Sequence, residues 1–142
     1  MTAIHCYTLE QLQPGMSAQF SRTVTVADIA NYAGVSGDMN PLHLDDAFGA
    51  STQFGSRIAH GMLSAGYIST ILGTKLPGPG AIYVSQTLQF RAPVRIGDTV
   101  VATATIKSID ARHARVTLDT ICSVGETQVI RGQAVMQIPR SA

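Results

Sequence analysis

Hydrophobic and polar residues follow different periods in the two halves of the chain. Residues 58–74 contain no Asp, Glu, Lys or Arg, and their apolar side chains fall on all sides of a helix. This pattern predicts a helix that is buried on most sides. Gly61, Gly66 and Gly73 lower helix stability, so we interpret them as points where the backbone packs closely against another element.

From Ala81 onward the period changes to two, which predicts four antiparallel strands in series. Turns are expected at 95–98, 110–111 and 124–126. One face of this meander is apolar, and the uncharged helix is the only element able to cover it. The expected fold class is therefore α+β, a curved antiparallel sheet wrapped around one long helix. The alternating apolar positions are Ile82, Val84, Leu88 and Phe90; Val100, Ala102, Ala104 and Ile106; Val116 and Leu118; and Ile130, Ala134, Met136 and Ile138.

The first third of the chain mixes short elements with turns. Residues 16–22 alternate weakly and are expected to form a short strand. Thr25 is a predicted helix N-cap, with Asp28 completing a capping-box pair. Residues 36–46 are rich in Gly, Asp, Asn and Pro and predict an ordered turn, after which Asp45 caps a second short helix.

Composition narrows the classes of function. The chain has 142 residues, which suits one domain over 1–142, and only 13% are charged, which favours a homo-oligomer. A net charge of +1 argues against nucleic-acid binding. The apolar helix is short for a membrane span and lacks basic flanks. No signal peptide is expected, and Cys6 and Cys122 are interpreted as reduced thiols of a cytoplasmic protein.

Only residues 38–43 place an acid and an imidazole close together in a constrained turn. Pro41 fixes its own φ angle and restricts Asn40, so Asp38 and His43 can point at one place. A carboxylate and an imidazole so arranged can hold a water molecule and transfer its protons. The alternative is that Asp38 only forms the turn and that His43 is a surface or hydrogen-bonded histidine.

A second candidate is His60-Gly61, at the start of the apolar helix. Helix N-termini carry free N–H groups, and Gly61 lets a ligand approach the backbone, so its N–H can stabilise an oxyanion. Tight packing of the helix on the sheet explains Gly61 equally well. We expect His5 and His113 to be solvated.

Taken together, these motifs resemble a known family. Asp-Met-Asn-Pro-Leu-His at 38–43, His-Gly-Met at 60–62, Ser69, and the segment 90–98 are similar to MaoC-like, R-specific enoyl-CoA hydratases with the hot-dog fold. The resemblance covers about residues 20–139. The turn motif followed by His-Gly-Met is specific in combination, although each part alone is weak.

The resemblance implies a role for each matching residue. Asp38 and His43 would hold the water that adds to a trans-2-enoyl thioester, giving an R-3-hydroxyacyl-CoA in a reversible reaction. The Gly61 N–H would stabilise the thioester oxyanion. Ser69 would support the site by hydrogen bonding to the dyad histidine, and Asn40 and His60 are further supporting residues. No metal or cofactor is implied, because coenzyme A is part of the substrate. The family also pairs two sheets edge to edge in a homodimer.

Substrate contacts are assigned more loosely. The acyl chain is expected in the core between the sheet and the helix, and cations at its entrance are expected to bind the phosphates of coenzyme A. The predicted acyl pocket consists of Ile68, Ile71, Leu72 and Val135. The predicted phosphate ligands are Arg57, Lys75, Arg91 and Arg95; a solvated surface charge is the alternative for each.

Three other functions stay open. A hot-dog thioesterase usually carries a carboxylate on or near the long helix, and residues 58–74 contain none. An acyl-carrier-protein dehydratase differs only in the carrier of the substrate. A non-catalytic acyl-binding module is disfavoured by the intact dyad. The sequence does not decide the acyl chain length or whether the pathway is fatty-acid metabolism or polyester precursor supply.

Overall fold

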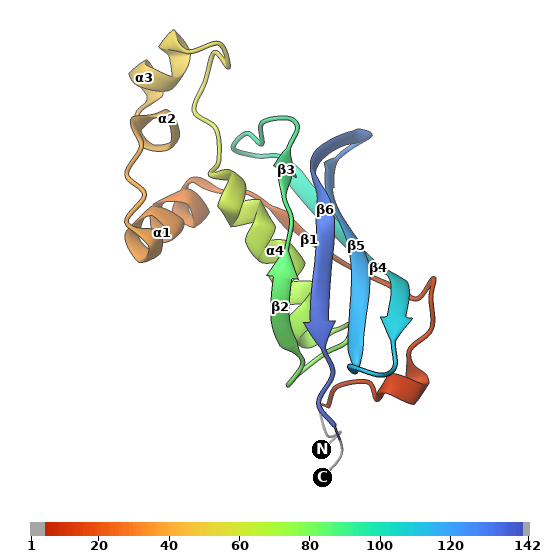
Figure 1. Cartoon of the computed structure of the whole chain (residues 1–142). Helices are drawn as coiled ribbons and strands as arrows, with labels where there is room; N and C mark the ends of the chain where they lie inside the picture. Colours follow the sequence, from red (N-terminus) through yellow and green to blue (C-terminus); the bar gives the residue numbers. More distant parts are fainter. Residues whose placement is uncertain (1–4, 141–142) are drawn as a thin grey trace.

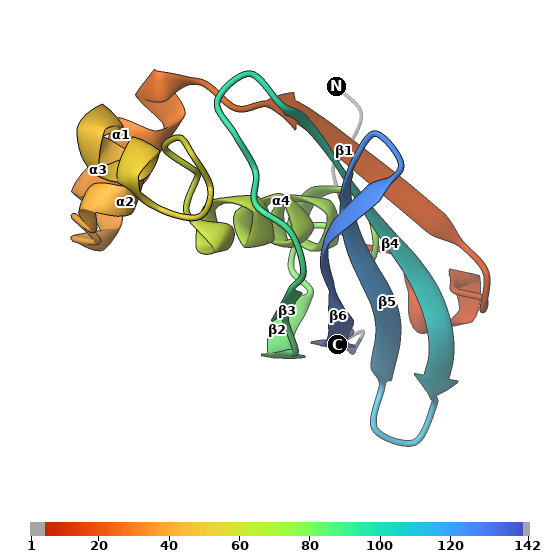
Figure 2. The same ribbon diagram turned by 90° about the horizontal axis from the view of Figure 1, so that it is seen from above.

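The fold was analysed in a computed structural model that describes residues 5–140. A six-stranded antiparallel sheet curves around one central helix, and three short helices gather at one end of the molecule (Figures 1 and 2). The helices are the 3-10 helix η1 (Leu9–Gln11), α1 (Val26–Ser36), α2 (Pro41–Leu44), α3 (Asp46–Ser51) and α4 (Gly61–Thr74). The strands are β1 (Ser17–Thr23), β2 (Ile82–Gln86), β3 (Gln89–Phe90), β4 (Thr99–Asp110), β5 (Arg115–Val124) and β6 (Thr127–Gln137).

The central helix α4 confirms the prediction for the apolar run. It packs against β1, β4, β5 and β6, and the sheet bends around it (Figure 2). Burial of these aliphatic side chains is the main favourable term in folding. The core is completed by the alternating inward positions of β4, β5 and β6, as predicted. The buried residues of α4 are Ser64, Ala65, Tyr67, Ile68, Ile71 and Leu72.

One stripe of α4 corrects the expectation of burial on most sides. Met62, Gly66, Ser69 and Gly73 are exposed, and their spacing of four, three and four residues places them on one face. The sheet curves around the opposite face, which carries the larger aliphatic side chains. Small residues on the exposed stripe therefore leave an open helix face in a single chain. Among the residues described, no helix is long and apolar enough to cross a membrane.

Strand order corrects the predicted four-strand meander. The sheet has the order β1-β4-β5-β6-β2, and β3 also pairs with β6. Strands β4, β5 and β6 form the expected meander, but residues 82–90 pair with the last strand rather than the next one. The weak pattern at 16–22 is the edge strand β1 beside β4. Alternation identifies the faces of a strand and not its partner, which explains the error.

The region 82–90 also departs from a single apolar face. A bulge between Tyr83 and Ser85 and a break before β3 interrupt the alternation. As a result Ile82, Val84 and Phe90 are exposed, and β2 forms an open edge of the sheet. This edge lies next to the exposed stripe of α4, because both line one cavity.

The predicted caps are confirmed. The Thr25 Oγ1 accepts from the Asp28 N–H at 3.1 Å, and the Asp28 carboxylate accepts from the Thr25 N–H at 3.0 Å. Helix α1 ends at Gly37, whose φ of 80° favours glycine. The Asp45 carboxylate accepts from the Phe48 N–H at 3.0 Å and starts α3. These caps fix both ends of the segment that carries the candidate site.

Replacing Gly132 by alanine should destabilise the fold markedly. A Cβ atom at this position would lie 1.8 Å from the carbonyl oxygen of Thr87, and backbone atoms cannot move aside as a flexible side chain can. We expect the free energy of unfolding to fall by about 3 kcal/mol or more, at the upper end of overpacking effects. Urea denaturation measures it. The matched control is Gly34→Ala on α1, where no atom lies within 4 Å and alanine should be neutral or stabilising. Equal stabilities for the two variants would contradict the packing at Gly132.

Candidate active site

The turn before α2 confirms the constrained geometry that the sequence predicts. The Asn40 side chain caps α2 by accepting from the Leu42 N–H at 3.0 Å, and Pro41 takes the first helical position. The Asp38 carboxylate accepts from the Asn40 N–H at 3.2 Å. Asp38 therefore does form the turn, and the same turn carries the imidazole of His43 on α2.

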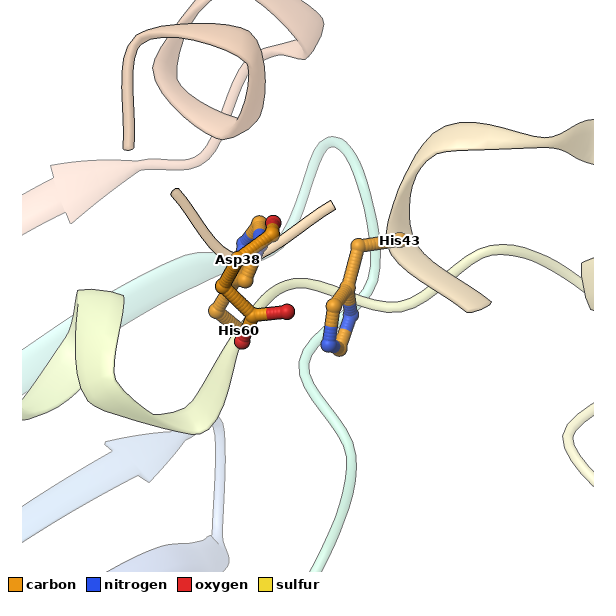
Figure 3. A group of neighbouring side chains, drawn as sticks. All are labelled: Asp38, His43 and His60. Atoms are coloured by element: carbon orange, nitrogen blue, oxygen red, sulfur yellow. The ribbon is translucent and has the colours of Figure 1, made fainter. Parts of the chain in front are cut away.

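The imidazole of His43 is buried and anchored on one side. Its Nδ1–H donates to the carbonyl oxygen of Ile58 at 2.8 Å. A carbonyl only accepts, so this bond fixes the tautomer of the neutral ring and leaves Nε2 free as an acceptor. The Asp38 carboxylate points toward this ring (Figure 3), and the ligating atoms of Asp38, His43 and His60 all lie within 4.8 Å of one another. Asp38 itself is exposed in the single chain.

Burial lowers the pKa of His43 below its usual value of 6.5, and the nearby ring of His60 lowers it further. The bond to the Ile58 carbonyl and the charge of Asp38 act in the opposite direction but are outweighed. The lowered pKa favours the neutral form of the His43 ring at neutral pH.

The three clustered side chains were also considered as a metal site. The rings of His43 and His60 stack with centroids 4.0 Å apart and planes inclined by 32°. The Nε2–H of His60 already donates to the carbonyl oxygen of Asp38 at 3.0 Å. The His60 ring therefore keeps only Nδ1 as a possible ligand atom.

Gly61 is the first residue of α4, and its N–H has no partner within the helix. The N-cap residue His60 makes no side-chain capping bond. Gly61 also packs tightly, since a Cβ atom there would lie 2.6 Å from the ring of Phe90. The tight-packing interpretation is therefore confirmed, and the oxyanion role of the Gly61 N–H, which lies beside a cavity, stays a prediction.

A cavity of about 410 Å³ joins His43 to Gly61. Its walls are mostly apolar, which suits an acyl chain. Ser64, one helical turn beyond Gly61, also lines it, and the buried Ser64 Oγ has no partner among the described residues. The sequence analysis missed Ser64, although its spacing of three residues from Gly61 was a usable signal. The other lining residues are Phe54, Ile58, Ala59, Met62, Phe90, Arg91, Ala92, Pro93, Val94, Val129 and Ile130.

The predicted acyl-pocket residues do not line this cavity. Ile68, Ile71 and Leu72 are fully buried against the sheet, and Val135 is half-buried on β6. The sequence identified them correctly as apolar and central. It could not show that the cavity opens at the N-terminal end of α4, where residues from 58–64 and 90–94 meet.

Ser69 lies away from His43 in the single chain. It is on the exposed stripe of α4 and lines a second cavity of about 550 Å³ beside β2. No hydrogen bond joins it to His43 in the part of the chain that the structure describes. It lies eight positions beyond Gly61 in the helix, about 12 Å along the axis.

Of the four predicted phosphate ligands, three hold the fold together. The Arg57 Nε–H donates to the carbonyl oxygen of His43 at 2.8 Å, and the Arg95 guanidinium donates to the Phe54 carbonyl at 2.7 Å. Lys75 donates to the Gln19 carbonyl at 2.5 Å, at the far end of α4. Arg91 is exposed at the cavity and makes no such bond among residues 5–140.

The exposure expected of His5 and His113 is confirmed. His5 is exposed, and the exposed His113 pairs with Asp110 at 2.8 Å. Cys6 and Cys122 are free thiols, and burial raises the pKa of Cys122 to about 12.

Comparison with known proteins places this geometry in a family. A model described as "MaoC like domain" matches residues 10–128. An (R)-specific enoyl-CoA hydratase of Rhodospirillum rubrum is 50% identical over 92% of this chain and 90% of its own. A 3-hydroxybutyryl-CoA dehydratase of Methylorubrum extorquens is 45% identical over 92% of this chain and 83% of its own. The solved (R)-hydratase of Aeromonas caviae is 40% identical, and the match covers 92% of this chain and 99% of the solved one. The two structures superpose with a TM-score of 0.89, which confirms the predicted hot-dog fold. The chain therefore belongs to the MaoC-like domain family.

Proposed function

We propose that this protein is an R-specific enoyl-CoA hydratase, a lyase that reversibly converts trans-2-enoyl-CoA to R-3-hydroxyacyl-CoA. The observation that carries the proposal is the pairing of the Asp38 carboxylate with the free Nε2 of His43, next to the Gly61 N–H and an apolar cavity. The relatives named as hydratases and dehydratases support the same reaction class.

The chemistry needs one water molecule and no cofactor. Nε2 of His43 accepts a proton from the water held between His43 and Asp38, and the hydroxyl adds to C3 of the enoyl group. Negative charge then moves to the thioester oxygen, where the Gly61 N–H stabilises it. The dyad returns a proton to C2. One O–H bond and the C2–C3 π bond break, and one C–O and one C–H bond form, so atoms and charge balance without a metal.

Activity should fall at acid pH with a midpoint below 6.5. The proposed base is neutral His43, whose pKa burial lowers from 6.5, so the ring loses its accepting lone pair only below that value. The same lowered pKa contributes stability that is complete above pH 6.5 and is lost as pH falls below it. A pH profile of kcat/KM measures this prediction. An acid limb centred above 6.5 would contradict neutral His43 as the base.

Arg91 is the proposed contact for the phosphates of coenzyme A, because it is the predicted cation that lines the cavity. Arg91→Ala should raise KM for an enoyl-CoA about tenfold and leave KM for the matching N-acetylcysteamine thioester unchanged, since that substrate has no phosphates. Arg112→Ala in the β4–β5 turn is the charge-matched control. Equal effects on both thioesters would rule out a phosphate contact.

We further propose a cytoplasmic homodimer. The open edge of β2 and the exposed stripe of α4 form one continuous, mostly apolar surface beside the second cavity. A second copy of the chain covers such a surface and removes an aggregation-prone edge. Light scattering at several concentrations tests this, and a monomer at all of them would contradict it.

Turnover of a short trans-2-enoyl-CoA tests the function itself. Hydration removes the absorbance of the conjugated thioester, and chiral analysis should show the R product. Unchanged absorbance would overturn the proposal. Release of free thiol would favour a thioesterase instead, although α4 carries no carboxylate. A preference for the carrier-protein thioester would favour an acyl-carrier-protein dehydratase, and binding without turnover a non-catalytic module.

A further inference from the structure

The ring of His60 packs against two other rings, each tilted relative to it. Its ring lies 4.0 Å from that of His43 on α2 and 4.6 Å from that of Tyr32 on α1, measured between centroids. It is almost fully buried, and it precedes α4 as the N-cap without making a capping bond. The His60 side chain therefore does not stabilise the start of α4 by capping.

The hydrogen bonds of His60 show which ring nitrogen acts as a donor. The carbonyl oxygen of Asp38 accepts from Nε2 at 3.0 Å, so Nε2 carries the hydrogen. Nδ1 is buried and has no partner among the described residues. His60 thus directs one N–H donor at the backbone of Asp38.

The bonds around Asp38 show what this donor does. The Asp38 N–H donates to the Ser36 Oγ at 3.1 Å, and its carboxylate accepts from the Asn40 N–H at 3.2 Å. Both partners lie within two residues, so these bonds shape the turn without placing it. Among residues 5–140, the bond from His60 is the hydrogen bond that ties Asp38 to a distant part of the chain.

The other member of the dyad is anchored to the same short segment. The Nδ1–H of His43 donates to the carbonyl of Ile58, two residues before His60. The segment is itself held, because the Ala59 N–H donates to the Val94 carbonyl at 2.7 Å and the Ile58 N–H donates to the Leu42 carbonyl at 3.3 Å. One rigid tripeptide therefore contacts both halves of the dyad.

We propose that residues 58–60 are the template that sets the spacing of the dyad, with His60 as the positioning residue for Asp38. This inference rests on the proposed function. The Ile58 carbonyl fixes His43, the His60 imidazole fixes Asp38, and the two anchors keep a constant separation because the chain joins them. Loss of the His60 donor frees the turn at 37–40 to shift relative to His43, and a shift of about 1 Å in a reacting group can cost about a hundredfold in rate.

Two substitutions of His60 separate its donor from its ring. His60→Gln keeps an N–H at the place of Nε2 but loses the aromatic ring, whereas His60→Phe keeps a ring and loses the donor. We expect kcat of the glutamine variant within about threefold of the wild type. For the phenylalanine variant we expect kcat to fall about 10- to 100-fold with KM nearly unchanged, because the substrate cavity is intact.

If the phenylalanine variant does not fold, His60→Leu, a second variant without the donor, replaces it in the comparison of kcat values. Equal kcat values for variants with and without the donor, in folded protein, would overturn the positioning role. A rise in KM in place of a fall in kcat would also overturn it, since that result indicates damage to the cavity. Absence of hydration by the wild type would instead refute the proposed function, so the two failures are distinguishable.

Discussion

Replacing Asp38 by asparagine should lower kcat for hydration about 10²- to 10⁴-fold, the range that general acid–base groups supply. Asparagine keeps an oxygen that can accept from the Asn40 N–H at 3.2 Å, so the turn should remain intact. What it loses is the negative charge that holds the water and completes the dyad with His43. Loss of enoyl-thioester absorbance at saturating substrate measures kcat directly.

Asp46→Asn is the matched control for this substitution. Asp46 is a carboxylate on α3 whose side chain is 89% exposed and makes a long contact of 3.6 Å to Arg57. Its removal should change kcat less than twofold, because exposed ion pairs contribute little. An Asp38→Asn enzyme as fast as this control would show that Asp38 only shapes the turn.

Replacing Gly61 by proline should lower kcat about 10²- to 10³-fold relative to alanine at the same position. Proline removes the backbone N–H that is proposed to stabilise the oxyanion, and it fits the first position of a helix. His60, the residue before it, has φ −58° and ψ 133°, which is compatible with a following proline. Alanine retains the N–H, so the difference in kcat between the proline and alanine variants measures the effect of this one hydrogen-bond donor.

Both substitutions at Gly61 add a Cβ atom that would touch the ring of Phe90 at 2.6 Å. They should therefore be compared in a Phe90→Ala background, where this contact is absent. Phe90 is exposed, so its loss should leave the fold stable. If proline and alanine give the same kcat in that background, the Gly61 N–H does not stabilise the transition state.

The sequence predicted the elements whose patterns are local. The uncharged run at 58–74, the capping box of Thr25 and Asp28, and the Asn40-Pro41 turn all depend on residues a few positions apart. Each is formed as expected. Motifs of this kind predict structure well because the interactions that cause them lie within the same short segment.

Features that depend on distant contacts were harder to predict. The pairing of β2 with β6, the open stripe of α4 and the position of the cavity follow from how the sheet curves, which no single segment encodes. Ser69 and Leu72 carry suitable side chains, yet both lie outside the cavity that holds His43. The bond from His60 to the Asp38 carbonyl joins residues 22 positions apart and has no signature in the sequence.

A double-substitution experiment tests most directly whether Asp38 and His43 act together on one water. His43→Asn keeps a donor at the place of Nδ1 for the Ile58 carbonyl and removes Nε2. Like Asp38→Asn, it therefore removes the group proposed to bind the water and keeps the contact that holds the residue in place. Groups that act as a unit are strongly non-additive. We predict that kcat of the double variant equals that of the slower single variant. A double variant slowed by the product of the two single effects would contradict a shared water.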